Sequence, residues 1–254
     1  MIGAMRLFGR AHADGDRLSV AGVVVRLKVN NRARRISLRL DRARREVVAT
    51  APSLRRLAEA VAFAHDRAGW IAEKVAELPE PSPLGPGMEI SVLGEPCRLE
   101  LARSRPRWVD ATDEHPSVIE ASGTGDAFAM GVVRVLRRRA LDWLCERTTH
   151  HALAFGQPQP RVSVMDAKGR WGSCRADPAG GPGVIRYSWR LVLAPAGVAD
   201  YVVAHECAHL LEQNHGPRFW ALVRARVGDV QPHRAWLAAE AARLHAFGQP
   251  LYRG

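Results

Sequence analysis

Apolar and polar residues alternate near the start of the chain. Every second position from residue 36 to residue 40 is apolar, which is the period of a half-buried strand. Residues 18–51 are therefore expected to be mainly strands. Ser53 follows a proline and precedes a helical pattern that runs to about Glu77, so it is the expected helix N-cap.

Prolines and glycines are concentrated over residues 79–87, where they interrupt regular secondary structure. This segment predicts a boundary between a basic strand and helix subdomain over residues 1–85 and a second domain over residues 86–254. The two parts can also form one continuous domain.

The middle of the chain alternates between short apolar runs and a long amphipathic stretch. The pattern predicts strands over residues 89–93 and 98–101, a largely irregular segment over 102–126 with a short strand at Val118–Ile119, and a long helix over 127–154. We recognise no internal repeat in the sequence.

The final third of the chain contains the most closely spaced patterns for secondary structure. Three strands and three helices are expected there: strands over residues 162–165, 170–174 and 184–193, and helices over 198–211, from Phe219 onwards, and from Pro232 to Leu244. The first of these helices is apolar on all sides, so it is expected to be buried. The sequence as a whole therefore predicts an α+β protein.

Composition excludes several classes of protein. Hydrophobic residues make up 47% of the 254 positions, which is too many for a disordered chain. No stretch of 18 apolar residues is present, so no membrane span is expected. Arg6 and Arg10 interrupt the apolar patch at the N-terminus, which argues against a secretory signal. The four cysteines are far apart, so a reducing cytoplasm is the expected location.

The buried helix contains the segment His205-Glu206-Cys207-Ala208-His209. A spacing of four residues places both imidazoles on one helical face, where they can bind the same metal ion. Glu206 lies beside that face and can reach a metal-bound water rather than the metal. A catalytic zinc ion would compensate for the burial of these polar groups.

A catalytic zinc ion usually has three protein ligands and one open position. His215 is the favoured third ligand because it follows the helix at a turn, and a straight helix has difficulty supplying three ligands to one ion. Glu212 is the main rival, and Glu240, Asp229 and His233 are weaker ones.

The spacing of the three histidines equals that of metzincin proteases. However, Glu212 stands where that motif has glycine, and the last methionine is Met165, so no methionine turn can follow the third ligand. The metzincin interpretation therefore fails.

Four further segments occur in a recognisable order: Arg170-Trp171-Gly172-Ser173-Cys174, Trp189-Arg190-Leu191-Val192-Leu193-Ala194-Pro195, Tyr201-Val202-Val203-Ala204-His205-Glu206 and Asn214-His215-Gly216-Pro217-Arg218-Phe219-Trp220. With these segments the chain resembles the YgjP-like metallopeptidase family, which is similar to the SprT-like and WLM zinc metalloproteases. The resemblance is close over residues 160–240 and looser over the strand near residue 36 and the helix after it.

The resemblance implies a zincin-like core of the minigluzincin type, with a small sheet and an active-site helix. It implies one zinc ion per chain held by His205, His209 and His215, with Glu206 as the general base. The implied activity is hydrolysis of peptide bonds in a peptide or protein substrate. The alternative is that the zinc ion is purely structural and the chain is an inactive scaffold. The presence of Glu206 argues against this alternative.

Other residues near these segments are weaker candidates for a functional role. Arg170 and Trp171 are interpreted mainly as structural residues, Phe219 and Trp220 as core residues, and His150-His151 as surface residues. Three residues remain open as the group that stabilises the oxyanion of the transition state: Tyr187, Arg218 and His233.

A second hypothesis comes from the net charge of +11. Residues 26–45 hold nine lysines and arginines against Asp41 alone, with no aromatic residue among them. Such a segment suits contact with phosphates rather than stacking on bases. The alternative function is therefore a nucleic-acid-associated protein in which proteolysis is secondary or absent.

Overall fold

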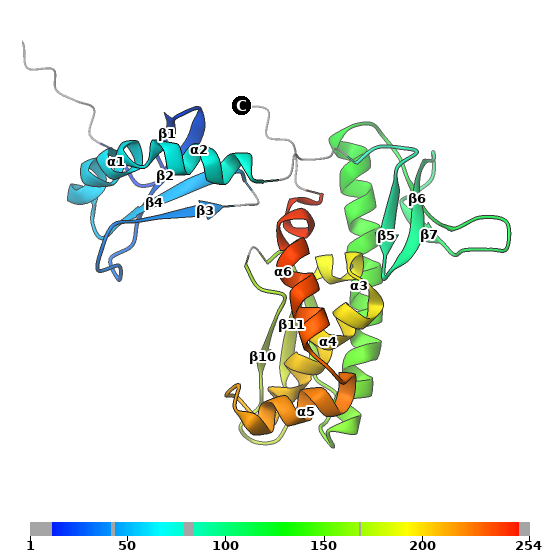
Figure 1. Ribbon diagram of the computed structural model, residues 1–254. Coiled ribbons are helices and arrows are strands. Elements are labelled where there is room, and N and C mark those ends of the chain that lie inside the picture. The colour runs from blue at the N-terminus through cyan, green and yellow to red at the C-terminus, as the bar shows by residue number, and fades with distance from the viewer. Residues whose placement is uncertain (1–11, 42–43, 79–83, 168, 249–254) are drawn as a thin grey trace, which may run out of the picture. The chain divides into compact units, whose positions relative to one another are not determined.

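The computed structural model describes residues 12–41, 44–78, 84–167 and 169–248. Contacts between Cα atoms divide the chain into an N-terminal unit, Met1–Glu80, and a C-terminal unit, Pro81–Gly254. Both units combine helices with small sheets (Figure 1), so the fold is of mixed α+β class. Among the residues that the structure describes, no helix has the length and apolar character needed to cross a bilayer.

The N-terminal unit is a four-stranded sheet with helices on one face (Figure 1). Along the sheet, the strands follow the order β1 (Arg17–Val20), β2 (Val23–Val29), β4 (Glu46–Ala51) and β3 (Ser37–Asp41). β2 and β4 are parallel, and the outer pairs are antiparallel. The core lies between this sheet and the helices, because alternate residues of β2 and β4 are fully buried against them.

The helix expected from Ser53 to Glu77 is interrupted in the structure. A 3₁₀ turn over Leu54–Arg56 leads into α1 (Leu57–Asp66), and α2 (Ala68–Ala76) follows after Arg67. The backbone of Arg67 has φ −104° and ψ 19°, outside the helical region. Gly69, a poor helix former, lies in the first turn of α2, which favours a break at this point.

The C-terminal unit begins with a second four-stranded sheet. Its strands follow the order β5 (Glu89–Val92), β6 (Glu95–Leu101), β8 (Ser117–Ala121) and β7 (Arg107–Val109). β6 and β8 are parallel, and the outer pairs are antiparallel. β7 lies in the segment 102–126 that was expected to be mostly irregular. It is only three residues long, too short for a period of two to be recognised.

The two four-stranded sheets share one topology. In both, a tight turn with two positive φ angles joins the first two strands: Ala21 (50°) and Gly22 (76°) in one, Leu93 (56°) and Gly94 (96°) in the other, as a type I′ hairpin turn requires. The sequences of the turns agree as well, since Ser-Val precedes and Arg-Leu follows at matching positions. The expectation that the chain contains no internal repeat is therefore wrong at the level of topology.

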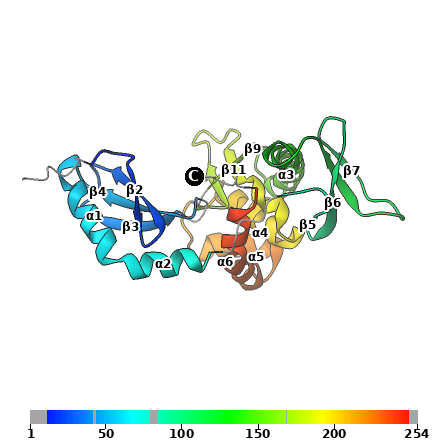
Figure 2. The ribbon, with the colours of Figure 1, turned by 90° about the horizontal axis from the view of Figure 1, so that it is seen from above.

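The rest of the C-terminal unit surrounds one long helix. This helix is α3 (Asp126–Ala154), and a three-stranded sheet follows it in the order β10 (Gly172–Arg175), β11 (Val184–Ser188) and β9 (Arg161–Met165). The last helices are α4 (Ala196–Ala208), α5 (Pro217–Val227) and α6 (Gln231–Ala246). α4 packs against α3, α5, α6 and β10, and Figure 2 shows α4 to α6 gathered beside α3.

The strand expected over residues 184–193 ends at Ser188. Residues Trp189–Leu193 form a 3₁₀ helix in which every residue is buried. An apolar run that is buried on all sides has no periodicity that separates a strand from a helix, so the sequence could not locate this change.

Candidate metal centre

The helix α4 carries the histidine motif in the interior of the C-terminal unit. Most of its side chains are buried, which explains its uniformly apolar sequence. The helix was expected to continue to residue 211, but it ends at Ala208, and His209 is its C-cap. This early end allows the chain to turn back, and α5 then begins with Pro217 at its first position.

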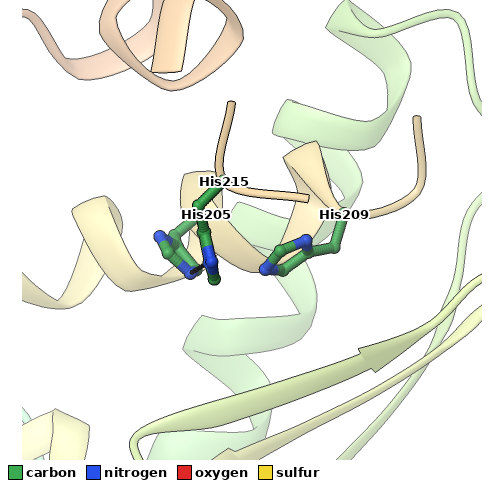
Figure 3. Close-up of side chains that lie close together, drawn as sticks. All are labelled: His205, His209 and His215. Carbon is green, nitrogen blue, oxygen red and sulfur yellow. Dashed lines mark hydrogen bonds between the residues drawn. The ribbon is translucent and has the colours of Figure 1, made fainter. Parts of the chain in front are cut away.

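Three imidazoles converge where the chain turns. One ring nitrogen from each of His205, His209 and His215 lies within 4.8 Å of the others, and Figure 3 shows the three rings gathered at the end of α4. The Nε2 atoms of His205 and His215 are 3.2 Å apart. Two nitrogens at zinc-binding distance in a tetrahedral site are separated by about 3.3 Å, so the spacing of this pair is compatible with a shared zinc ion.

The environment of the rings also suits a metal. The Nδ1 of His209 is 3.0 Å from the carbonyl oxygen of Glu212, and donation of its hydrogen to that oxygen leaves Nε2 free to bind an ion. Burial, together with the other two histidines, lowers the pKa of His205 to about 4. His205 is therefore neutral at physiological pH, as a metal ligand must be.

Two aromatic residues of α5 support the histidines. Phe219 is buried, and its ring lies within 4.6–4.8 Å of all three imidazoles, measured between ring centroids. Trp220 stacks on His215 at 5.9 Å. These residues pack in the core, as expected, and they also restrict the orientation of the rings.

Glu206 lies next to the histidines and is 6% exposed. Burial raises its pKa to about 7, although the charge of Arg170 opposes this shift. Its side chain rests on the backbone of β10, because a Cβ atom added to Gly172 would lie 2.5 Å from Oε1. Only glycine at position 172 therefore leaves room for Glu206 in this orientation.

A cavity of about 440 Å³ opens beside His205 and Glu206. Its other lining residues come from the start of β10, from α4 and from α6: Arg170, Trp171, Gly172, Tyr201, Val202, Arg234, Leu237, Ala238 and Ala241. Sequence reasoning missed Tyr201 and Arg234. Tyr201 is four residues before His205 and could have been recognised from helical spacing, whereas no local signal marked Arg234.

Trp171 combines a structural role with a place on the cavity wall. Its ring stacks on the buried His245 with 4.8 Å between centroids and an interplanar angle of 16°. Arg170 is exposed and also lines the cavity. The contact with His245 agrees with a structural role for Trp171, and a substrate role of either residue stays untested.

The rival ligands are engaged elsewhere. Glu240 pairs with Arg243, the Asp229 carboxylate accepts a hydrogen bond from the backbone of Gln231 at 3.0 Å, and His233 stacks on Tyr201. The Glu212 side chain is likewise outside the histidine group. Within the described ranges, no other set of three or more histidine, cysteine or acidic side chains comes together in this way.

The residues considered for the oxyanion have different positions. Tyr187 is fully buried, and its hydroxyl is 3.0 Å from the Thr148 hydroxyl. It is therefore not available to a substrate. Arg218 is exposed at the start of α5. Neither Arg218 nor His233 lines the cavity.

His151 was expected at the surface, but it is buried. Its Nδ1 accepts a hydrogen bond from Arg226 on α5 at 3.1 Å, so its Nε2 donates to Asp200 on α4 at 2.9 Å. Arg147 on α3 also binds Asp200, at 2.7 and 3.1 Å. The hydrogen bond to the Asp200 carboxylate compensates for the burial of His151. The hydrogen bonds of this cluster connect α3, α4 and α5.

Comparison with known proteins gives one match. A family model described as "YgjP-like, metallopeptidase domain" matches residues 34–240. No curated protein and no solved structure matches the chain. The matched region covers most of the chain and includes the three histidines and Glu206, so the chain belongs to the YgjP-like metallopeptidase family.

Proposed function

We propose that this protein is a zinc-dependent peptidase with a zincin-like core. His205, His209 and His215 hold the ion, one per chain, and Glu206 is the general base. The observation that carries the proposal is the convergence of the three imidazoles beside a buried carboxylate at the mouth of a cavity. Zinc bound there supplies Lewis-acid catalysis, which polarises a carbonyl group and makes water more acidic.

Glu206 moves the proton in this mechanism. Its carboxylate accepts a proton from the attacking water and passes that proton to the nitrogen of the leaving amine. Burial raises the pKa of Glu206 above its ordinary value, which makes its carboxylate a stronger base for the first of these steps. The Glu206 side chain already lies against β10, where Gly172 leaves room for it, so little reorganisation is needed during the reaction.

Tyr201 is the proposed oxyanion donor. It lines the cavity one helical turn before His205, and burial raises the pKa of its hydroxyl. The hydroxyl therefore stays protonated at neutral pH and can donate a hydrogen bond to the developing negative charge.

The proposed substrate is an extended peptide that pairs with β10. This strand is at the edge of the three-stranded sheet and lies directly against Glu206. An edge strand offers unpaired backbone groups to a peptide, and this pairing would place the scissile bond near the cavity.

The test compares Glu206→Gln with Glu212→Gln, which makes the same chemical change outside the histidine group. Both variants should bind about one zinc per chain. Glu206→Gln should lower peptide hydrolysis at least about a hundredfold, which is typical for loss of a general base, whereas Glu212→Gln should retain activity. Equal activity of Glu206→Gln and wild type would refute the role of Glu206, whereas zinc binding without peptide hydrolysis by wild type would favour structural zinc.

A second candidate function rests on the open face of the N-terminal sheet. Away from α1 and α2, this face carries four basic side chains against two carboxylates: Arg17, Arg26, Lys28 and Arg39 against Asp41 and Glu46. The corresponding face of the second sheet carries two basic and three acidic side chains: Arg98 and Arg107 against Glu89, Glu100 and Glu120. This contrast favours phosphate binding by the first sheet.

The two sheets supply a matched experiment for this candidate. We propose measuring the affinity of the full chain for a fluorescent DNA duplex at several salt concentrations. The double variant Lys28→Gln and Arg39→Gln should reduce the slope of log affinity against log salt by about 2. The double variant Arg98→Gln and Arg107→Gln should leave it unchanged. Absence of duplex binding at low salt would eliminate this candidate.

A further inference from the structure

The cavity beside Glu206 holds two arginines that form no salt bridge with the residues that the structure describes, although the Glu206 carboxylate is near Arg170. Arg170 precedes β10, and Arg234 belongs to α6. Some other arginines of the C-terminal unit do form salt bridges, such as Arg147 with Asp200 and Arg243 with Glu240. The two cations of the cavity are therefore available to an anion from outside.

Both arginines lie near the residues proposed for catalysis. The guanidinium carbon of Arg234 is 5.5 Å from the centroid of the Trp220 ring, and this ring stacks on His215. Arg170 and Arg234 line the same cavity as His205 and Glu206. An anion bound in this cavity would thus lie next to the proposed reacting groups.

The wall of the cavity suits a short aliphatic chain. Trp171 is held in place by its stacking on His245, and Leu237 adds a buried apolar surface. Ala238 and Ala241 present only methyl groups from α6, so they leave space for a side chain. The cavity therefore combines apolar walls with cationic groups.

We propose that Arg170 and Arg234 form a carboxylate subsite, so that the enzyme selects peptides with a carboxylate next to the scissile bond. The inference rests on the proposed peptidase function and adds a substrate class to it. Carboxylates are the anions that peptides carry, either on an acidic side chain or at a free C-terminus. Guanidinium groups bind them through paired, charge-assisted hydrogen bonds, which the partly apolar cavity strengthens.

Three peptides separate the two sources of the carboxylate. The first is an acetylated and amidated alanine-rich pentapeptide with glutamate at its centre. The second has glutamine there, and the third combines this glutamine with a free C-terminal carboxylate. Binding to the zinc-loaded Glu206→Gln protein is measured by calorimetry, and cleavage by wild type is followed by mass spectrometry.

The variants Arg170→Gln and Arg234→Gln are compared with Arg243→Gln, which removes an arginine of the same helix α6 outside the cavity. Each is combined with Glu206→Gln for the binding measurement. One of the two carboxylate peptides should bind about tenfold more tightly than the neutral peptide, as expected for one charged hydrogen bond. Arg170→Gln and Arg234→Gln should each remove most of this preference, whereas Arg243→Gln should keep it. Zinc content and circular dichroism verify that every variant is folded.

The outcomes also separate this inference from the proposed function. Equal binding of all three peptides, or a preference that survives in both Arg170→Gln and Arg234→Gln, would overturn the subsite. Cleavage by wild type without a preference for carboxylates would support the peptidase and refute the subsite. If wild type cleaves none of the peptides but the arginine-dependent preference in binding is observed, the subsite stands and the proposed peptidase function fails.

Discussion

The two four-stranded sheets have the same strand order, the same directions and matching registers, yet they serve different purposes. In the register between parallel strands, Arg26 pairs with Val48 in the first sheet, and Arg98 pairs with Val118 in the second. The first sheet forms a core with α1 and α2 alone, whereas the second belongs to the core that contains the histidine helix.

The hairpin turns show the difference most clearly. The N–H of Leu93 donates to the carbonyl of Val192 at 2.7 Å, and the carbonyl of Leu93 accepts from the N–H of Ala196 at 3.2 Å. The second sheet therefore supports the start of α4. The equivalent residues of the first sheet, Ala21 and Gly22, are exposed. The same strand arrangement thus supports the helix of the candidate metal centre in the second sheet, whereas the turn of the first sheet is exposed to solvent.

The largest expected effect comes from matching core positions of the two sheets. Leu27 and Leu99 are equivalent and fully buried, so truncation of either to alanine should lower the free energy of unfolding by about 3 kcal/mol. Only Leu99→Ala should also weaken zinc binding, because its sheet braces α4. Chemical unfolding and zinc titration measure the two effects. An equal loss of zinc affinity in Leu27→Ala would contradict the division of roles.

An effect of about 2 kcal/mol is expected from acid in the C-terminal unit. Burial alone would raise the pKa of Asp200, but hydrogen bonds from His151 and Arg147 lower it to about 2. The lowered pKa stabilises the folded state above pH 4, and this contribution is lost as the pH falls from about 4 through about 2.

The variant Asp200→Asn tests this dependence. It should be about 2 kcal/mol less stable than wild type at neutral pH, and its stability should depend less on pH in the acid range. Thermal unfolding at a series of pH values measures both. If the two proteins lost stability in parallel between pH 4 and pH 2, Asp200 would not be the group responsible.

The smallest expected effect concerns the two turns. Gly22 and Gly94 have φ angles of 76° and 96°, so an alanine at either position should cost about 1 kcal/mol of backbone strain. Gly94→Ala should in addition weaken zinc binding, because it disturbs the neighbouring bonds of Leu93. Thermal unfolding and zinc titration test the pair, and identical zinc affinities would show that the turn does not brace α4.

The sequence predicted the chemistry of the candidate site better than its surroundings. Two histidines four residues apart converge on any helix, so His205 and His209 could be paired without a fold. The position of His215 depended on where α4 ends, and the prolines and glycines near residue 216 marked the turn approximately. Arg234 lies on a separate helix, and only tertiary packing determines that it faces the cavity.

The errors in the predicted fold have similar physical causes. Buried segments such as residues 184–193 lack a polar face, so a strand and a 3₁₀ helix gave the same pattern. The repeated sheet was missed because conserved topology requires only alternation and a turn glycine, as at Gly22 and Gly94. His151 was predicted to lie at the surface because its half-buried partner, Asp200, is distant in the sequence.

The bonds of Leu93 also determine how far the chain can be shortened. A fragment that begins at α3 would keep every residue of the candidate metal centre. It would nevertheless lose the partners of the Val192 carbonyl and the Ala196 amide, both of which Leu93 binds. Removal of the sheet would also expose the core that packs against Val92, Leu99 and Ile119, which is costly, so the smallest autonomous catalytic fragment should include the whole second sheet, from about residue 85.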